Sequence, residues 1–103
     1  MEFSKRKWGY YLTVYSAKNF KIKLLYFKAG HSCSMQRHFK RSELWCFLFG
    51  RGLMMSDARY VMKGGNALVV QKNQWHQFTA FDRSLVLEIQ TGTCEESDIE
   101  RAA

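Results

Sequence analysis

Short runs of strand-forming residues follow one another closely along this chain, and no proline interrupts them. Turn-like residues separate the runs, for example Gly50-Arg51-Gly52 and Gly64-Gly65-Asn66. The runs predicted as strands are Trp8–Tyr15, Phe20–Lys28, Ser34–Phe39, Leu44–Phe49, Gly52–Ser56, Arg59–Met62, Ala67–Val70, His76–Phe81 and Ser84–Gln90. Only Cys94–Arg101 has a helical pattern, with acidic residues near its start, where the helix dipole favours anions.

This succession of short strands predicts an all-β sandwich or barrel, because closing a sheet or pairing it with another removes exposed edges. At 103 residues the chain suits one domain, spanning residues 1–103. Trp8–Tyr15 is the candidate edge strand. We therefore expect a single-domain, all-β protein with a short C-terminal helix.

The stretch from Gly30 to Gly50 concentrates the polar residues of interest. Side chains alternate between the two faces of a strand, so Gln36, His38 and Lys40 are expected to share one face. Glu43 begins a second row, which continues into large apolar side chains. An ionised carboxylate in such a place costs several kcal/mol unless a cation or donors compensate it, so a compensating group is expected beside Glu43.

The apolar pattern also predicts the core. The aromatic residues assigned to it are Trp45, Phe47, Phe49, Trp75 and Phe78. Leu44–Phe49 is apolar on both faces, as in a central strand. In the second predicted strand, Phe20, Ile22 and Leu24 alternate with Lys21 and Lys23.

Charge is unevenly distributed along the chain, whose formal net charge is +7. All but one of the 16 lysines and arginines precede Thr93, whereas four of the nine acids follow it. A basic body attracts phosphates or other anions, although a solvated surface explains the charge equally well. No arginine-rich run or basic helix favours nucleic acid. No apolar run is long enough to span a membrane, so no membrane partner is expected. The expected partner is a small anionic ligand rather than nucleic acid.

The three cysteines form no Cys-x-x-Cys pair. A disulfide framework and a thiolate zinc site are therefore not expected. The basic N-terminus leads into a mixed alternating run rather than an apolar signal segment. These features predict a cytoplasmic protein.

Two motifs of the chain resemble those of the cupin family. The first cupin motif, G-x5-H-x-H-x3,4-E-x6-G, is matched in spacing by Gly30, Gln36, His38, Glu43 and Gly50, with glutamine for the first histidine. The second, G-x5-P-x-G-x2-H-x3-N, is matched by Gly65, Gln71, Asn73, His76 and Ala80, of which only the glycine and histidine are retained.

Within the cupins, the chain resembles the C-terminal domain of type II phosphomannose isomerases. Arg6-Lys7-Trp8-Gly9-Tyr10-Tyr11 is similar to the R-P-W-G-x-Y pattern at the start of that domain. Residues 34–45 are similar to its S-L-Q-x-H-x-H-R-x-E-x-W pattern, with Lys40 in place of a further histidine. Glu88-Ile89-Gln90-Thr91-Gly92 is similar to E-V-Q-x-G. The glutamine in the first motif is itself a feature of this group.

The resemblance implies a small antiparallel β-barrel in jelly-roll topology that holds one divalent metal ion. The ligands would be Gln36, His38, Glu43 and His76, and mixed nitrogen and oxygen ligation suits zinc, manganese, iron or nickel. The residues alone also fit polar groups that satisfy one another in a barrel without metal. Because cupins commonly pair edge to edge, a homodimer is expected.

Two functions remain open from the sequence. The protein binds a sugar phosphate or similar small anion through Lys40 and Arg41, or it is an aldose–ketose isomerase that interconverts mannose 6-phosphate and fructose 6-phosphate. Lys40 and Arg41 are also compatible with a solvated loop. The isomerase reaction needs a base and an electrophile, and no base is identified because Glu43 is assigned to the metal. We therefore expect binding with weak or absent turnover. A metal-dependent oxygenase fits less well, because a glutamine replaces one histidine.

Overall fold

The computed structural model describes residues 1–102, which form short strands and no helix. The strands are β1 (Glu2–Arg6), β2 (Gly9–Ala17), β3 (Phe20–Phe27), β4 (Gln36–Arg37), β5 (Arg41–Phe49), β6 (Arg51–Met55), β7 (Arg59–Lys63), β8 (Ala67–Val70), β9 (Gln77–Ala80), β10 (Ser84–Gly92) and β11 (Glu100–Arg101). The all-β prediction is confirmed. Within the same residues there is accordingly no helix long and apolar enough to cross a membrane.

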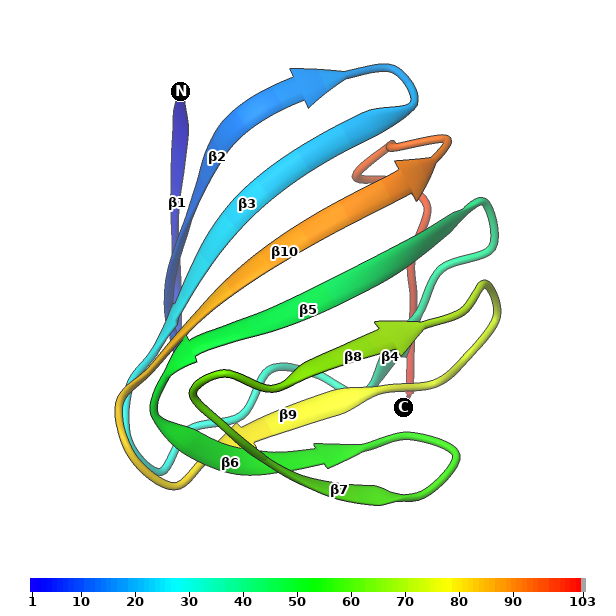
Figure 1. The fold of residues 1–103 in the computed structure, drawn as a ribbon. Helices are drawn as coiled ribbons and strands as arrows, with labels where there is room; N and C mark the ends of the chain where they lie inside the picture. The colour runs from blue at the N-terminus through cyan, green and yellow to red at the C-terminus, as the bar shows by residue number, and fades with distance from the viewer. Residues whose placement is uncertain (103) are drawn as a thin grey trace.

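The strands form three antiparallel sheets. A six-stranded sheet has the order β1-β2-β3-β10-β5-β8, a three-stranded sheet the order β7-β6-β9, and β11 pairs with β4 (Figure 1). The smaller sheet lies below the large one, and the chain segment before β4 runs beside β9 through the bridges Ser32–Thr79 and Gln36–His76. The two sheets thus enclose one interior, as expected for a small barrel.

Most predicted strands are confirmed, with bounds shifted by a few residues. Ser34–Phe39 is the exception, because only Gln36–Arg37 is a strand and the flanking residues pair irregularly. The prediction that Trp8–Tyr15 lies at the edge is wrong, since β1 pairs with β2 along its whole length. The sequence did not reveal β1 because none of its residues is buried, so it lacks an alternating apolar pattern.

The predicted C-terminal helix is also wrong. Residues Glu96 and Ser97 form a turn, and the following residues extend into β11, which pairs with Gln36 and Arg37. The carboxylate of Asp98, one of the acidic residues near the start of the predicted helix, accepts hydrogen bonds from the backbone N–H groups of Phe39 and Lys40 (both 2.9 Å). The C-terminal segment is therefore held by hydrogen bonds to Phe39 and Lys40 rather than by hydrogen bonds within a helix.

The apolar core fills one part of the interior. Its centre is an aromatic cluster in which Phe78 lies 5.0 Å from both Phe27 and Phe47, measured between ring centroids. Each such ring, when fully buried, stabilises the fold by roughly 1.5–3 kcal/mol. Trp45 belongs to this core as predicted. Phe49 does not, because a β-bulge where β5 pairs with Leu85 and Val86 breaks the alternation and leaves its ring exposed.

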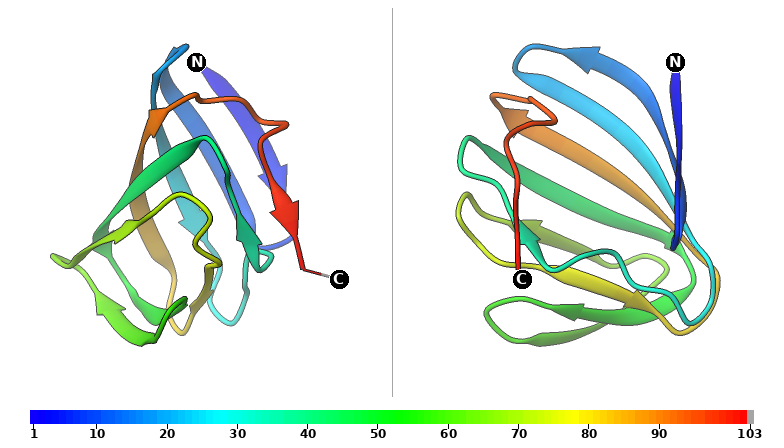
Figure 2. Two further views of the ribbon diagram at one scale, coloured as in Figure 1. Left: turned by 90° about the vertical axis from the view of Figure 1, so that its right-hand side faces the viewer. Right: turned by 180° about the vertical axis from the view of Figure 1, so that it is seen from behind.

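The other part of the interior is polar. Along β3, β10 and β5 the inward face changes from apolar to charged and polar side chains. Glu88 on β10 pairs in register with Lys23 on β3. Two residues further along β10, Gln90 pairs with Lys21 on β3 and with Glu43 on β5. The C-terminal segment passes this end of the large sheet on its way to β4 (Figure 2). The fold therefore gathers charged groups at one end of the barrel and covers them with the end of the chain.

Candidate metal and anion site

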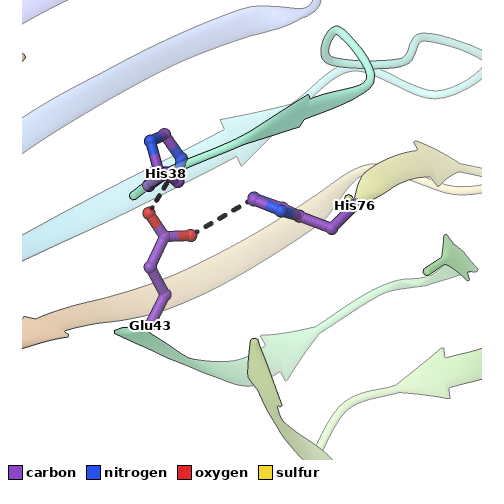
Figure 3. Close-up of side chains that lie close together, drawn as sticks. All are labelled: His38, Glu43 and His76. Atoms are coloured by element: carbon purple, nitrogen blue, oxygen red, sulfur yellow. Dashed lines mark ion pairs between the residues drawn. The ribbon is translucent and has the colours of Figure 1, made fainter. Parts of the chain in front are cut away.

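Three side chains from separate parts of the chain meet at the polar end. His38 follows β4, Glu43 lies on β5 and His76 precedes β9 (Figure 3). Glu43 is the common partner: its Oε2 is 3.3 Å from His38 Nε2, and its Oε1 is 3.4 Å from His76 Nε2. All three residues are almost completely buried, and one ligand-capable atom from each lies within 4.8 Å of the others.

The outer nitrogen of each histidine is held by a backbone carbonyl. His38 Nδ1 lies 2.6 Å from the carbonyl oxygen of Asp98, and His76 Nδ1 lies 3.1 Å from that of Gln74. When Nδ1 donates to these carbonyls, the lone pair of each Nε2 points towards Glu43. Within residues 1–102, His76 Nε2 is buried and has no hydrogen-bond partner. This donor set fits a divalent ion, since metal-binding histidines are oriented in the same way.

Glu43 is compensated by donors as well as by the histidines. Arg41 Nε and Nη2 each lie 2.9 Å from Oε2, and Trp45 Nε1 donates to Oε1 (3.0 Å). Burial alone would raise the pKa of Glu43, but His76, Arg41 and His38 outweigh it and hold that pKa well below its usual range. The carboxylate is therefore ionised, and the compensating cation expected from the sequence is present as Arg41.

The two histidines respond differently to their surroundings. Burial lowers the pKa of His38, and the charge of Arg41 acts in the same direction. Burial would also lower the pKa of His76, but Glu43 outweighs it and raises the value. The Glu43 carboxylate therefore favours the protonated form of His76.

The glutamine of the first motif lies beside this cluster. Reciprocal backbone hydrogen bonds join Gln36 to His76 (3.0 and 2.9 Å), which fixes the spacing of the two motifs. The Gln36 side-chain oxygen accepts a hydrogen bond from Ser34 Oγ (3.1 Å) and lies in the wall of the adjacent pocket. The structure thus gathers three of the four predicted ligands into one cluster, with the fourth next to it.

A pocket of about 410 Å³ opens next to the cluster, and its wall is rich in cations. The basic residues that line it are Arg6, Lys7, Lys23, Arg41 and Arg101. Two carboxylates, Glu88 and Glu96, and the aromatic rings of Trp8, Tyr11 and Trp45 complete much of the wall. His38 belongs both to the pocket wall and to the cluster, and Arg41 lines the pocket while it contacts Glu43. A ligand in the pocket therefore lies next to the candidate metal site.

The two predicted anion anchors are placed differently. Arg41 is buried and faces the pocket, whereas Lys40 is exposed, with its Nζ 3.8 Å from Glu95. The expectation that Lys40 shares the inward face is wrong. A bend at Phe39 and Lys40, held by the Asp98 carboxylate, interrupts the strand and shifts the alternation by one residue.

The sequence did not place Lys23 in the pocket, and it did not single out Glu88. Lys23 alternates with apolar residues, a pattern that usually marks a solvent-facing side chain, yet it points inward against the Tyr11 ring (4.2 Å). Lys23 and Lys21 both contact Glu96 Oε1, at 2.8 and 3.0 Å. Glu88 lies between two apolar neighbours on β10 and is also buried. The only sequence signal for Glu88 is its place in the E-V-Q-x-G-like segment.

The fold and this cluster together define a cupin: an antiparallel double-stranded barrel with two histidines and a glutamate from the two cupin motifs at one end. A sequence profile described as "Mannose-6-phosphate isomerase C-terminal" matches residues 2–103, and the chain belongs to this family.

Similar proteins agree with this assignment. A mannose-1-phosphate guanylyltransferase from Sinorhizobium fredii is 28% identical over 102 residues, which are 95% of this chain and 20% of that protein. The chain therefore spans about a fifth of the length of this relative. KdgF from Halomonas sp. has a similar fold, with a TM-score of 0.82 and 12% identity over 94% of this chain and 93% of the other. An RmlC-like cupin from Desulfovibrio desulfuricans has a TM-score of 0.72 and 26% identity over 79% of each chain.

Proposed function

We propose that this protein is a metal-binding cupin that binds a sugar phosphate or a similar small anion. The observation that carries the proposal is the cation-rich pocket directly beside the His38–Glu43–His76 cluster. Five basic side chains in its wall offer more positive charge than the two carboxylates there offset. Its volume and aromatic lining are of the kind that encloses a small ligand, and a phosphate ester would gain charge-assisted hydrogen bonds.

The metal part of the proposal rests on the donor set. His38, Glu43 and His76 would hold the ion, and Gln36, which lies beside them, would be the fourth ligand. A divalent ion bound there supplies positive charge that polarises a substrate carbonyl or holds an oxygen of the ligand. Zinc, manganese, iron and nickel all accept such mixed ligation.

Arg41 is the main anion anchor in this proposal. It lines the pocket and carries a planar set of donors suited to a phosphate. Lys40 would act only from outside the pocket, because its side chain is exposed. Isothermal titration calorimetry with mannose 6-phosphate and with unphosphorylated mannose tests the proposal.

We expect mannose 6-phosphate to bind at least about tenfold more tightly than mannose, a difference of roughly 1.4 kcal/mol. Arg41→Met should remove most of this preference, whereas Arg83→Met, a change at an exposed arginine in the turn before β10, should leave it intact. Equal affinity for the two sugars would refute an anion site. The relatives' names motivate the choice of mannose 6-phosphate.

Active aldose–ketose isomerisation of mannose 6-phosphate and fructose 6-phosphate is the second candidate. One observation favours it over binding alone: the pocket contains a carboxylate, Glu88, that takes no part in the metal cluster. In this second candidate function, Glu88 would be the base that the sequence did not identify.

We also propose a homodimer located in the cytoplasm. β1 is one of the two edge strands of the large sheet, the other being β8, and it carries the exposed ring of Phe3 next to Tyr10 on β2 (5.2 Å between centroids). An unpaired edge of this kind can pair with a second copy. Light scattering should give about twice the chain mass of 12.1 kDa. A mass of one chain in dilute solution would rule the dimer out.

A further inference from the structure

The feature that carries a further inference is the buried carboxylate of Glu88. On the large sheet it pairs in register with Lys23 on one side and Trp45 on the other. All three side chains face the interior and line the pocket. Glu88 is also the diagonal neighbour of Glu43, which faces Gln90, and such neighbours lie about 7–8 Å apart. A ligand that reaches the metal cluster is therefore within reach of Glu88.

Only one oxygen of this carboxylate is engaged. Gln90 Nε2 donates to Glu88 Oε1 at 2.7 Å, and within residues 1–102 the other oxygen, Oε2, has no hydrogen-bond partner. The Gln90 contact fixes the orientation of the side chain. Because Glu88 contributes to the pocket wall, the free oxygen is the one available to a ligand.

The surroundings also adjust the proton affinity of Glu88. Burial raises its pKa most, the negative charge of Glu43 raises it further, and Lys23 and Arg41 lower it, leaving the pKa at about 8. A carboxyl group whose pKa lies near the working pH can both accept and return a proton. Glu43 differs, because its pKa is held low and both of its oxygens are already bound.

We propose that Glu88 is the acid–base residue of this pocket and transfers a proton between C1 and C2 of a bound aldose or ketose phosphate. This inference rests on the proposed sugar-phosphate site, and it assigns the group that isomerisation needs. It replaces the expectation that the pocket lacks a base.

The proposed step balances without an oxidant or reductant. Glu88 removes the proton from C2 of the aldose, the C2–H electron pair forms a C1–C2 double bond, and the carbonyl electrons move to O1, which takes up a proton from water to give an enediol. The proton on Glu88 then returns to C1, where it bonds to the electron pair of the C1–C2 double bond. At the same time O2 gives its proton to water, and the O2–H electron pair forms the new C2 carbonyl bond.

The other carboxylate in the wall is less suited to this role. Both lysines of β3 contact a single oxygen of Glu96, and although burial opposes them, they lower its pKa to about 2. A carboxylate with so low a pKa is a weak base at neutral pH. Glu88 is therefore the carboxylate that combines access to the ligand with suitable basicity.

Proton exchange with solvent tests the proposal directly. The zinc-loaded protein is incubated with mannose 6-phosphate in D₂O, and NMR follows loss of the C2 proton signal, which reports the base even if net turnover is slow. We expect Glu88→Gln to lower the exchange rate by about 10²–10⁴-fold, the usual contribution of an acid–base group. Calorimetry should show that Glu88→Gln still binds the ligand, because the substitution keeps the size of the side chain.

The controls separate this inference from the proposed function. Asp82→Asn changes an exposed carboxylate that pairs with Arg51 and should exchange at the wild-type rate. Wild-type protein that binds mannose 6-phosphate without exchange, or Glu88→Gln that exchanges at the wild-type rate, overturns the role of Glu88 and leaves the binding site standing. Wild-type protein that does not bind the sugar phosphate overturns both.

A second variant covers the case in which Glu88→Gln does not fold. Glu88→Asp keeps the charge but withdraws the carboxylate by one methylene, and we expect the exchange rate to fall by about 10²-fold, as a displacement of this size does for an aligned catalytic group. Circular dichroism shows whether each variant is folded. An unchanged rate in folded Glu88→Asp refutes the proposal.

Discussion

Arg41 and Glu43, two residues apart on β5, form a buried ion pair in which Nε and Nη2 of the guanidinium each lie 2.9 Å from the same carboxylate oxygen. Arg41 Nη2 also lies 3.3 Å from His38 Nε2. The guanidinium therefore contacts two of the atoms that a metal ion would use. A metal ion bound at this site would therefore compete with Arg41 for the Glu43 carboxylate.

Replacing this arginine should strengthen metal binding. In Arg41→Met, Glu43 loses its competing cation and the ion is no longer repelled by a neighbouring positive charge. We expect zinc affinity, measured by competition with a chromophoric chelator, to rise at least about tenfold, or roughly 1.4 kcal/mol. Lys40→Met removes the same charge from an exposed neighbour and should change the affinity little. A weaker affinity in Arg41→Met would contradict the competition.

The histidines should determine metal content. His38→Ala and His76→Ala each remove a nitrogen ligand, so plasma mass spectrometry of protein purified without chelator should show about one ion per chain in the wild type and little in either variant. His31→Ala is the matched control, because His31 is exposed and bonded only to the carbonyl of Ala29. Metal content that is the same in all four proteins would show that the ion binds elsewhere.

Asp98 should stabilise the loop that carries His38. Its carboxylate accepts hydrogen bonds from two backbone N–H groups, which Asp98→Ala leaves unpaired. We expect the free energy of unfolding to fall by about 1–3 kcal/mol. Metal affinity should fall about 10–100-fold, as when groups that orient metal-binding histidines are disturbed. Ser97→Ala, at an exposed neighbouring position, should change neither the chemical denaturation curve nor the affinity.

The lysine–glutamate cluster should make stability depend on pH. The pKa of Glu96 is about 2 in the folded state against an ordinary value of 4.5, because Lys23 and Lys21 outweigh the effect of burial. The stabilisation by Glu96 is therefore complete above 4.5 and is lost as the pH falls through that window towards about 2. Denaturation of the wild type and Glu96→Gln at several pH values should show a difference that shrinks over this range.

At neutral pH we expect Glu96→Gln to lower the free energy of unfolding by roughly 1–3 kcal/mol, since it leaves two buried ammonium groups without a carboxylate. Glu95→Gln is the comparison, because Glu95 is exposed and its ion pair with the exposed Lys40 is long, at 3.8 Å. It should change stability by no more than about 0.5 kcal/mol. A pH-independent difference for Glu96→Gln would contradict the lowered pKa.

The strand pattern was predictable wherever strands have alternating or continuous apolar residues, as in β3, β5 and β10. β1 was not predictable, because it has no buried face, and the turn at Glu96 has the same acidic composition as a helix start. The contacts that select the turn come from Lys21 and Lys23, more than 70 positions away, and local composition carries no information about them.

The site was predictable to the extent that motif spacing fixes it. His38, Glu43 and His76 meet as their spacing implies, since strand pairing joins Gln36 to His76. Lys40 faces solvent and Arg41 faces the pocket, because the bend at Phe39 and Lys40 shifts the alternation of side chains by one residue between His38 and Arg41. The sequence could not place Lys23 in the pocket and did not single out Glu88, because charged residues between apolar ones usually face solvent.

The division of the interior into an apolar and a charged part has an evolutionary consequence. Buried ionic groups often contribute nothing to folding stability or reduce it. Replacing them with well-packed apolar residues can stabilise a protein by about 1–4 kcal/mol. Selection for folding alone would therefore favour leucine or methionine at Lys23 and Glu88, both of which lie inside the barrel. In homologues that have lost the function of the pocket, apolar replacements that increase folding stability should therefore accumulate. Loss of charge at these two positions would be an early sign of that loss of function.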